Sequence, residues 1–311
     1  MILSAAISEF LLSMKGVLSD KTVLFYQNRL PSMVSYLGDK PLELVTLSEL
    51  RTWRSFLTDK TTRYDKGSSR PPASGGYSPY TIHQYIRGCK RFFLWCVEEG
   101  LIEKNPARRL EKPHLPKIRA KGITSNQLDL LLVAAGRGSA EPEAAINKLR
   151  DVSIILFLAD TACRVGGIAA LCLNDLDLSN CQATIREKGR GGWGKERVVF
   201  FTEHTRDVIG AWLEDRSYRD LPGDSLFGLG TDGIYQMLKR TAKRAGVVDN
   251  WNPHSFRHAA IRAWLNNGMP ISEVATLAGH STVKVTADVY GVVSDQVLQR
   301  DYVKYNWLCK A

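Results

Sequence analysis

The sequence predicts a mainly α-helical protein with one small β-sheet, divided into two domains. Apolar residues recur at helical intervals along most of the 311-residue chain, whereas strand-type alternation is confined to one stretch around a glycine-rich turn. A basic, proline-containing segment also separates a shorter first part from a longer second part. A chain of this length can bury two hydrophobic cores.

The first domain is expected to cover residues 1–103, with four helical stretches. The stretch 2–14 has apolar side chains at helical spacing and contains Glu9, which indicates an amphipathic helix and not a signal peptide. The stretch 19–37 contains Pro31, and proline kinks or splits a helix. The apolar side chains of each stretch predict one buried face.

Two further helices complete this domain. One is expected to begin at Thr46 or Ser48, where a hydroxyl can cap the first turn. Residues 59–79 are rich in Gly, Pro and Ser and predict a loop. A longer helix over about 79–99 follows, with apolar and cysteine side chains on one side and basic side chains on the other.

Residues 104–122 contain three prolines and seven basic side chains. Proline ends helices and charge opposes burial, so this segment is predicted to be an interdomain linker. From composition alone, a solvated hinge and a segment that follows a phosphate backbone are about equally compatible with it.

The second domain is expected at 123–293, followed by a tail at 294–311. Residues 183–201 alternate β-branched side chains around a glycine-rich turn and predict a β-hairpin. Helices are expected at 124–136, 143–161, 165–172, 203–216, 231–246, 253–267, 271–278 and about 282–290.

The charge of the chain indicates a polyanionic partner, most simply nucleic acid. The net charge is +10, and residues 1–120 hold 19 basic against 11 acidic side chains, compared with 23 against 21 in residues 121–311. The excess in the first part predicts non-specific attraction to phosphates there. The candidate DNA contacts are Arg87, Lys90, Arg91, Arg108, Arg109, Lys117 and Arg119.

Several classes of protein are not supported. No apolar run is long enough to span a bilayer, and the six cysteines form no C-x-x-C pair and have no histidine at zinc spacing. They are expected to be reduced and buried. Neither a metal nor a cofactor is expected.

Two motifs of the second domain place charged side chains where they can bind phosphate. Arg164 follows one apolar helix and precedes another, and its planar guanidinium suits a phosphate oxygen pair. Lys188 lies at the glycine-rich turn of the predicted hairpin, with Lys195 as a rival across the turn. Each of these is a weak indication when taken alone.

Two more motifs follow in the same domain. His254 and Arg257 are three residues apart after Pro253, which puts both on one helix face, whereas His258 and Arg262 are expected on other faces in structural roles. The stretch GHSTVKVTADVYG then places His280 ten residues before Tyr290.

The order and spacing of these motifs resemble the tyrosine recombinase (phage integrase) family over essentially the whole chain. That family has an Arg in a T-G-x-R-x-x-E setting, a hairpin Lys, H-x-x-R, G-H, and a Tyr nine or ten residues after that His. TVLFYQNRL and TIHQYIRGCKRFFLWCVEEGLIEKNPARRL also resemble its helical first domain. The matching positions are Arg164, Lys188, His254, Arg257, His280 and Tyr290.

The resemblance implies a helical, SAM-like core-binding domain and a mixed α+β catalytic domain of the DNA breaking–rejoining type. One position departs from the pattern. The family often has an acidic residue three positions after the first arginine, where it helps orient active-site side chains, and this chain has Gly167. The departure concerns the expected fine geometry of the site and not its chemistry.

The resemblance also implies a mechanism. Tyr290 attacks a DNA phosphate to form a 3′-phosphotyrosyl link, and Arg164, Arg257 and His280 hold the phosphate oxygens. His254 is the acid/base partner, and Lys188 protonates the departing 5′-oxygen. Tyr302 and Tyr305 are rival nucleophiles, but neither has a G-H motif at the right distance.

The implied partner is a double-stranded DNA recombination site, with two duplexes held by a homotetramer and strands exchanged through a four-way junction. The tail 294–311 then docks on a neighbouring subunit or packs on its own domain. The expected location is cytoplasmic, at the nucleoid. Two alternatives are a type IB topoisomerase-like enzyme and an architectural DNA-binding protein that has lost catalysis.

Overall fold

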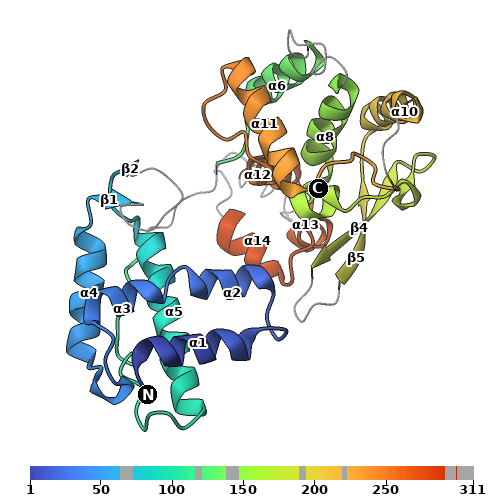
Figure 1. Cartoon of the computed structure of the whole chain (residues 1–311). Coiled ribbons are helices and arrows are strands. Elements are labelled where there is room, and N and C mark those ends of the chain that lie inside the picture. Colours follow the sequence, from blue (N-terminus) through green and yellow to red (C-terminus); the bar gives the residue numbers. More distant parts are fainter. Residues whose placement is uncertain are drawn as a thin grey trace, which may run out of the picture. The chain divides into compact units, whose positions relative to one another are not determined.

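The computed structural model describes residues 1–63, 73–115, 121–137, 147–188, 194–218, 223–290 and 299. The chain divides into two compact units, Met1–Lys117 and Ile118–Ala311 (Figure 1). Each unit has its own hydrophobic core. Both are mostly helical, as the sequence predicts. The expected sheet forms in the second unit, and a further two-stranded sheet forms in the first unit, within the stretch 59–79 that was expected to be a loop. The division falls within the expected linker 104–122.

Helices build the first unit, and all four expected helical stretches form. Pro31 splits the second stretch and occupies the first turn of the new helix, where its missing N–H leaves no hydrogen bond unmade. The elements are α1 (Leu3–Met14), α2 (Asp20–Gln27), α3 (Pro31–Leu37), η1 (Leu42–Leu44), α4 (Leu47–Asp59), β1 (Thr62–Arg63), β2 (Ala73–Ser74) and α5 (Pro79–Glu98).

Hydroxyl caps and aromatic packing hold this unit together. Thr46 begins α4 in a capping box with Glu49, and the Ser78 side chain accepts a hydrogen bond at the start of α5. At the centre, the Phe10 ring meets those of Phe92 and Trp95 edge-on, with centroids 5.7 and 5.4 Å apart. Helices α1 and α5 are therefore joined through aromatic contacts.

The first unit extends beyond the expected boundary at residue 103. Ala107 and Leu110 are buried in its core, and Lys90 Nζ on α5 donates hydrogen bonds to the Arg108 and Leu110 carbonyls, at 3.0 and 2.8 Å. The basic composition of this segment suggested a solvated chain, but its charged side chains point outward while the apolar residues between them pack inward. Residues 104–110 thus belong to the first unit.

The second unit contains the predicted helices and hairpin. Its elements are α6 (Ser125–Arg137), α8 (Lys148–Thr161), α9 (Val165–Ala169), η2 (Leu173–Asp175), β3 (Leu176–Asp177), β4 (Gln182–Lys188), β5 (Gly194–Phe200), α10 (Glu203–Ser217), α11 (Thr231–Ala245), α12 (Pro253–Asn266), α13 (Ile271–Ala278) and α14 (Val283–Tyr290). The expected helix 165–172 ends at Ala169, because the Asp175 carboxylate accepts the Cys172 N–H and starts a separate turn. Residues 143–146, the hairpin turn 189–193 and the tail, apart from Gln299, lie outside the described residues.

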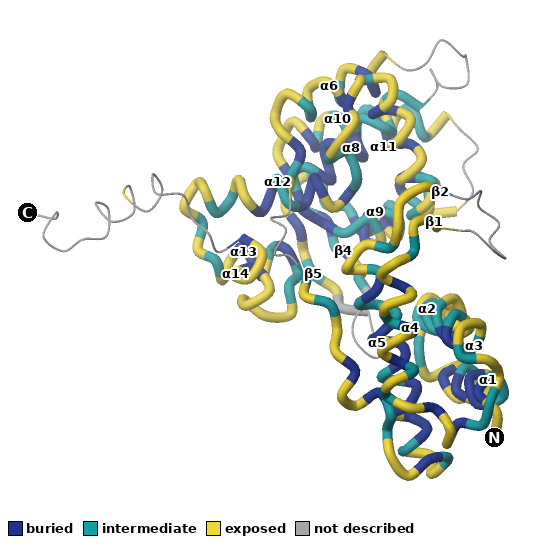
Figure 2. Tube along the Cα trace, turned by 90° about the vertical axis from the view of Figure 1, so that its left-hand side faces the viewer, coloured by how far each residue is buried: buried dark blue, intermediate teal, exposed yellow. Residues whose placement is uncertain are grey.

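Helix α8 lies at the centre of the second unit. Every residue from Ser153 to Leu158 is buried, and the helix packs against α6, α10 and α12 (Figure 2). A helix that is apolar on all sides has to be covered on all sides. Its carboxyl end, at Thr161, is therefore a fixed point in the unit.

The three-stranded antiparallel sheet has the order β3-β4-β5. Ala183 and Ile185 on β4 and Val199 on β5 are buried in the core. Since side chains alternate across a strand, Glu187 and Arg197 lie on this same inward side. The register pairs Ile185 with Arg197, which makes Glu187 the diagonal neighbour of Arg197.

Cysteines Cys89, Cys96 and Cys163 are buried and free, whereas Cys172 and Cys181 are half-buried. Burial raises the pKa of the Cys96 thiol to about 12, so it stays protonated. Among the helices that the structure describes, none is long and apolar enough to cross a membrane.

Candidate active site

Tyr290 ends α14 and has its ring buried, with 9% of the residue exposed. The ring packs in a small cluster with Ala162, Ala260, Ile261, Val274 and Ala278. Burial raises the pKa of its hydroxyl to about 12, although Arg257 and Arg262 act in the opposite direction. The hydroxyl is therefore protonated at neutral pH and has to lose a proton before it can attack.

The Tyr290 hydroxyl is hydrogen-bonded to Nδ1 of His258 on α12. The sequence places His258 on another face of the helix in a structural role, whereas in the structure its ring contacts the residue expected to be the nucleophile. His258 is four residues after His254, and residues four apart are neighbours on a helix surface. The spacing of four residues could therefore have placed His258 beside His254 from the sequence. Burial lowers the pKa of His258, with His254, Arg257 and Arg262 adding to the effect, so its ring is neutral at neutral pH.

Arg257 lies on α12 and is almost fully buried, at 4% exposed. Its Nη1 donates to the Ala162 carbonyl at 2.7 Å, while Nη2 is buried and has no hydrogen-bond partner among the described residues. Ala162 presents that carbonyl from a left-handed conformation, φ 51°, at the end of α8. Burial lowers the Arg257 pKa to about 10, so the side chain keeps its charge and one free donor at neutral pH.

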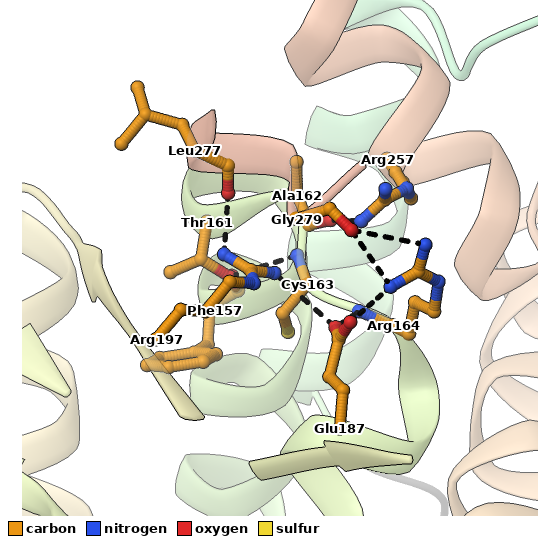
Figure 3. A network of polar contacts seen from close by, with 10 residues as sticks. All are labelled: Phe157, Thr161, Ala162, Cys163, Arg164, Glu187, Arg197, Arg257, Leu277 and Gly279. Carbon is orange, nitrogen blue, oxygen red and sulfur yellow. Dashed lines mark hydrogen bonds and ion pairs between the residues drawn. The ribbon is translucent and has the colours of Figure 1, made fainter. Parts of the chain in front are cut away.

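Arg164 is the N-cap residue of α9, and its side chain is 42% exposed. Its Nη1 forms an ion pair with Glu187 on β4, and both Nη atoms lie 3.5 Å from the Gly279 carbonyl (Figure 3). Gly279 immediately precedes His280. Arg164 thus lies between the sheet and the G-H motif, which are far apart in the sequence.

Glu187 and Arg197 are site residues that the sequence-based reasoning missed. The Glu187 carboxylate also accepts hydrogen bonds from the Arg164 backbone N–H and from Arg197 Nη2, both at 3.3 Å, and Arg197 Nη1 donates to the Leu277 carbonyl. Burial raises the Glu187 pKa, but Arg197 and Arg164 outweigh it and hold the pKa below its usual range. The sequence does contain a pattern that could have identified Glu187. Ala183, Ile185 and Glu187 alternate along one strand, which predicts that the carboxylate lies on the side that faces the core.

His280 is held by Thr286, whose hydroxyl lies 2.7 Å from its Nδ1. Burial, followed by Arg257, Arg164 and Arg197, lowers the His280 pKa to about 4, so its ring is neutral at neutral pH. When the buried Thr286 hydroxyl donates to Nδ1, the proton of the imidazole is on Nε2. In that tautomer His280 offers one N–H to a ligand.

The remaining predicted residues are placed less completely. His254 is exposed in the first turn of α12, and its pKa is lowered by partial burial and by Arg257 and Arg164. The backbones of Lys188 and Lys195 belong to β4 and β5, and their side chains lie outside the described part of the chain.

The expected DNA contacts of the first unit fall into three groups. Arg108 and Arg109 are exposed. Arg91 pairs with Glu98 at 3.2 Å, and Arg87 stacks 4.7 Å from the Phe25 ring centre. Lys90 donates to backbone carbonyls within the first unit. Lys117 and Arg119 lie outside the described residues.

Gly167 marks a close approach of α9 to β4. A Cβ atom there would lie 2.5 Å from Cγ2 of Ile185, whereas a Cβ on the adjacent Gly166 would meet nothing within 4 Å. We expect Gly167→Ala to lower the free energy of unfolding by about 1–3 kcal/mol, since it overpacks the core. Denaturant unfolding measures this, with Gly166→Ala as the matched control, and equal stabilities of the two variants would contradict the expectation.

The phage integrase family model matches residues 121–296, more than half of the chain. The chain belongs to the phage integrase family. The similarity that its motifs showed is thereby confirmed, as is the enzyme class, a tyrosine-type DNA strand transferase. The same family membership supports a role in site-specific recombination.

Relatives of this phage integrase family chain are tyrosine recombinases. It is 30% identical over 293 residues to tyrosine recombinase XerC of Corynebacterium efficiens, covering 90% of this chain and 83% of the relative. It is 26% identical over 283 residues to tyrosine recombinase XerA of Saccharolobus solfataricus, covering 91% and 86%.

Solved structures of other integrases share the fold. The Tn1549 transposon integrase, solved with circular intermediate DNA, matches with a TM-score of 0.71 and 18% identity over 97% of this chain and 99% of that chain. A lambda integrase dimer bound to a COC′ core site matches with a TM-score of 0.68 and 14% identity, over 92% and 97%. The predicted fold class of this phage integrase family member is therefore confirmed.

Proposed function

We propose that this phage integrase family member is a site-specific DNA recombinase that cuts and rejoins DNA through a covalent 3′-phosphotyrosyl link on Tyr290. The observation that carries the proposal is a convergence of side chains. Tyr290 packs against Ala162, whose carbonyl accepts from Arg257, and Arg164 lies against the carbonyl of Gly279, the residue before His280. A phenol nucleophile beside two cations and an N–H donor suits attack on a phosphodiester.

The cations would stabilise the charge that develops on the phosphate. In the transition state, negative charge gathers on the non-bridging oxygens, and preorganised donors lower its energy. Nη2 of Arg257, which has no hydrogen-bond partner within the described part of the chain, is one such donor, and exposed Arg164 offers a second guanidinium. Neutral His280 would add a hydrogen bond through Nε2–H. Arginine suits this task because its fork of N–H groups matches two phosphate oxygens.

The Tyr290 oxygen would form the new bond to phosphorus while the bond to the 5′-oxygen breaks. Neutral His258, which is hydrogen-bonded to the hydroxyl, would accept the phenol proton as the oxygen attacks. His254, one turn earlier on α12, is a second acid/base candidate. Lys188, or its rival Lys195, would supply the proton that the departing 5′-oxygen needs.

The covalent link keeps the energy of the broken bond, so a 5′-hydroxyl from another duplex can reverse the reaction and exchange strands. We infer a homotetramer on two double-stranded sites, with paired exchanges through a four-way junction. The tail 294–311 would connect neighbouring subunits. The protein would work on DNA at the nucleoid of the cytoplasm, and its affinity would fall steeply with salt.

Covalent trapping tests the function. Wild-type protein would be incubated with nicked duplexes tiled from the DNA that flanks its gene, and a denaturation-resistant protein–DNA band is expected on one fragment. Plasmids with one or two copies of that fragment would then be compared. Recombinant products from the two-site plasmid alone support a recombinase. Relaxation of the one-site plasmid without recombination indicates a topoisomerase, and specific binding without a band indicates an architectural protein.

His258→Gln is expected to slow cleavage by about 10²–10⁴-fold, since an amide can accept a hydrogen bond but cannot take a proton. The wild-type rate should be level from pH 8 to about 6.5 and fall below that, as His258, with its lowered pKa, becomes protonated. The groups facing His258 are Tyr290, His254, Arg257 and Arg262. Single-turnover rates between pH 5 and 8 measure both effects.

His204→Gln, an exchange of an exposed histidine on α10, is the matched control and should leave the rate unchanged. A His258→Gln variant that cleaves at the wild-type rate and keeps the acidic decline would assign the proton transfer to another group. His254 would then be the next residue to test.

A further inference from the structure

Three guanidinium groups and a single carboxylate form the polar network behind the proposed phosphate site (Figure 3). Arg164, Arg197 and Arg257 repel one another, and each lowers the pKa of His280. Glu187 is the only acidic residue among those drawn in the network. Its side chain is 10% exposed, as is that of Arg197, so solvent screens this pair weakly.

The two oxygens of the Glu187 carboxylate contact different parts of Arg164. One oxygen pairs with Nη1 of the guanidinium, and the other accepts the backbone N–H of the same residue at 3.3 Å. This second oxygen also accepts from Arg197 Nη2. A carboxylate that contacts both the backbone N–H and the guanidinium of an arginine restricts the rotamers of that arginine far more than a nearby charge does.

Arg197 extends the same network to the G-H motif. Its Nη1 donates to the Leu277 carbonyl, and a Cβ atom on Gly279 would lie 2.5 Å from its Nε. The glycine before His280 therefore makes room for this guanidinium. Glu187 thus connects Arg164 to the segment that carries His280.

Close packing at Gly167 leaves no space for an acidic side chain on α9, and the carboxylate comes from the sheet instead. Helix α9 carries no acidic residue, and a Cβ atom at Gly167 would lie 2.5 Å from Ile185 Cγ2 and 3.6 Å from Cγ of Glu187. Strand β4 therefore occupies the space that a side chain on this turn of α9 would need. The acidic group missing at Gly167 is matched by one from the neighbouring strand.

We propose that Glu187 is a positioning residue, which orients Arg164 toward the phosphate and, through Arg197, keeps the His280 segment in place. Its effect on catalysis rests on the proposed recombinase function, whereas its effect on Arg164 does not. The carboxylate acts through these arginines and does not itself touch DNA. A side chain without the negative charge would leave Arg164 free to rotate.

The test compares Glu187→Gln with Glu196→Gln, a glutamate of the same hairpin that pairs with Arg186 at 2.8 Å but is 60% exposed and outside the network. In DNA-free protein, ¹⁵N relaxation of the Arg164 Nε–H, assigned by its loss in Arg164→Lys, should show a mobile guanidinium only in Glu187→Gln. On the trapped fragment, single-turnover cleavage at saturating DNA should fall by about 10²-fold, the loss typical of a misplaced catalytic group. DNA affinity should stay equal or rise, since a negative charge is removed.

An Arg164 guanidinium that is equally rigid in both variants would overturn the proposal, and so would an unchanged cleavage rate. A role in net charge alone predicts tighter DNA binding with no loss of rate. If wild-type protein traps no DNA, the proposed function fails, while the relaxation measurement still decides the role of Glu187. Should Glu187→Gln not fold, Glu187→Asp retains the charge, withdraws it by one methylene, and is expected to show the same two changes.

Discussion

Tyr290→Phe is expected to abolish the covalent protein–DNA band, with a loss of cleavage of at least about 10⁴-fold, as for other removed nucleophiles. The phenylalanine ring can keep the packing of Tyr290 against Ala260 and Ile261, so the fold and specific DNA binding should persist. The His258 Nδ1 loses its partner, which costs about 1 kcal/mol of stability. Trapping on nicked duplexes and a gel-shift titration on the same fragment measure the two effects.

Tyr218→Phe is the matched control, because Tyr218 is 90% exposed and has no part in the proposed chemistry. It should trap DNA as wild type does. A band that survives in Tyr290→Phe would mean that another tyrosine attacks, and Tyr302 and Tyr305 of the tail would be tested next.

Arg257→Lys should lower single-turnover cleavage by about 10²–10³-fold, the usual cost of removing one donor that stabilises transition-state charge. The charge is retained, but a lysine has no second arm, so it cannot both donate to the Ala162 carbonyl and reach the phosphate with a fixed fork. Rates at saturating DNA measure the effect, and DNA affinity should change little.

Arg240→Lys, on the exposed side of α11, is the control for an arginine-to-lysine exchange and should cleave normally. An Arg257→Lys variant with wild-type rate would show that charge alone suffices at this position. The free Nη2 of Arg257 would then have no part in the mechanism.

Local patterns in the sequence were sufficient for most of the helices and for the motifs of the family. Periodicity predicted α1, α5 and α8, and Pro31 marked the place where the stretch 19–37 would kink or split, because these features depend on neighbours within a few residues. The H-x-x-R and G-H motifs with Tyr290 identified a family that the comparisons then confirmed. These motifs are visible because each lies within one short segment.

Contacts between segments were decided by the tertiary structure alone. Arg257 meets the carbonyl of a residue 95 positions away, and Arg164 lies against one 115 positions away. The sequence shows that no acidic residue stands at position 167. It does not show which strand approaches α9, so a carboxylate supplied by Glu187 could not be predicted. His258 was missed in a similar way, since its role depends on where α14 places the Tyr290 hydroxyl. Residue types and spacing are properties of the chain, whereas the partner of a buried charge is set by how distant elements pack to satisfy it.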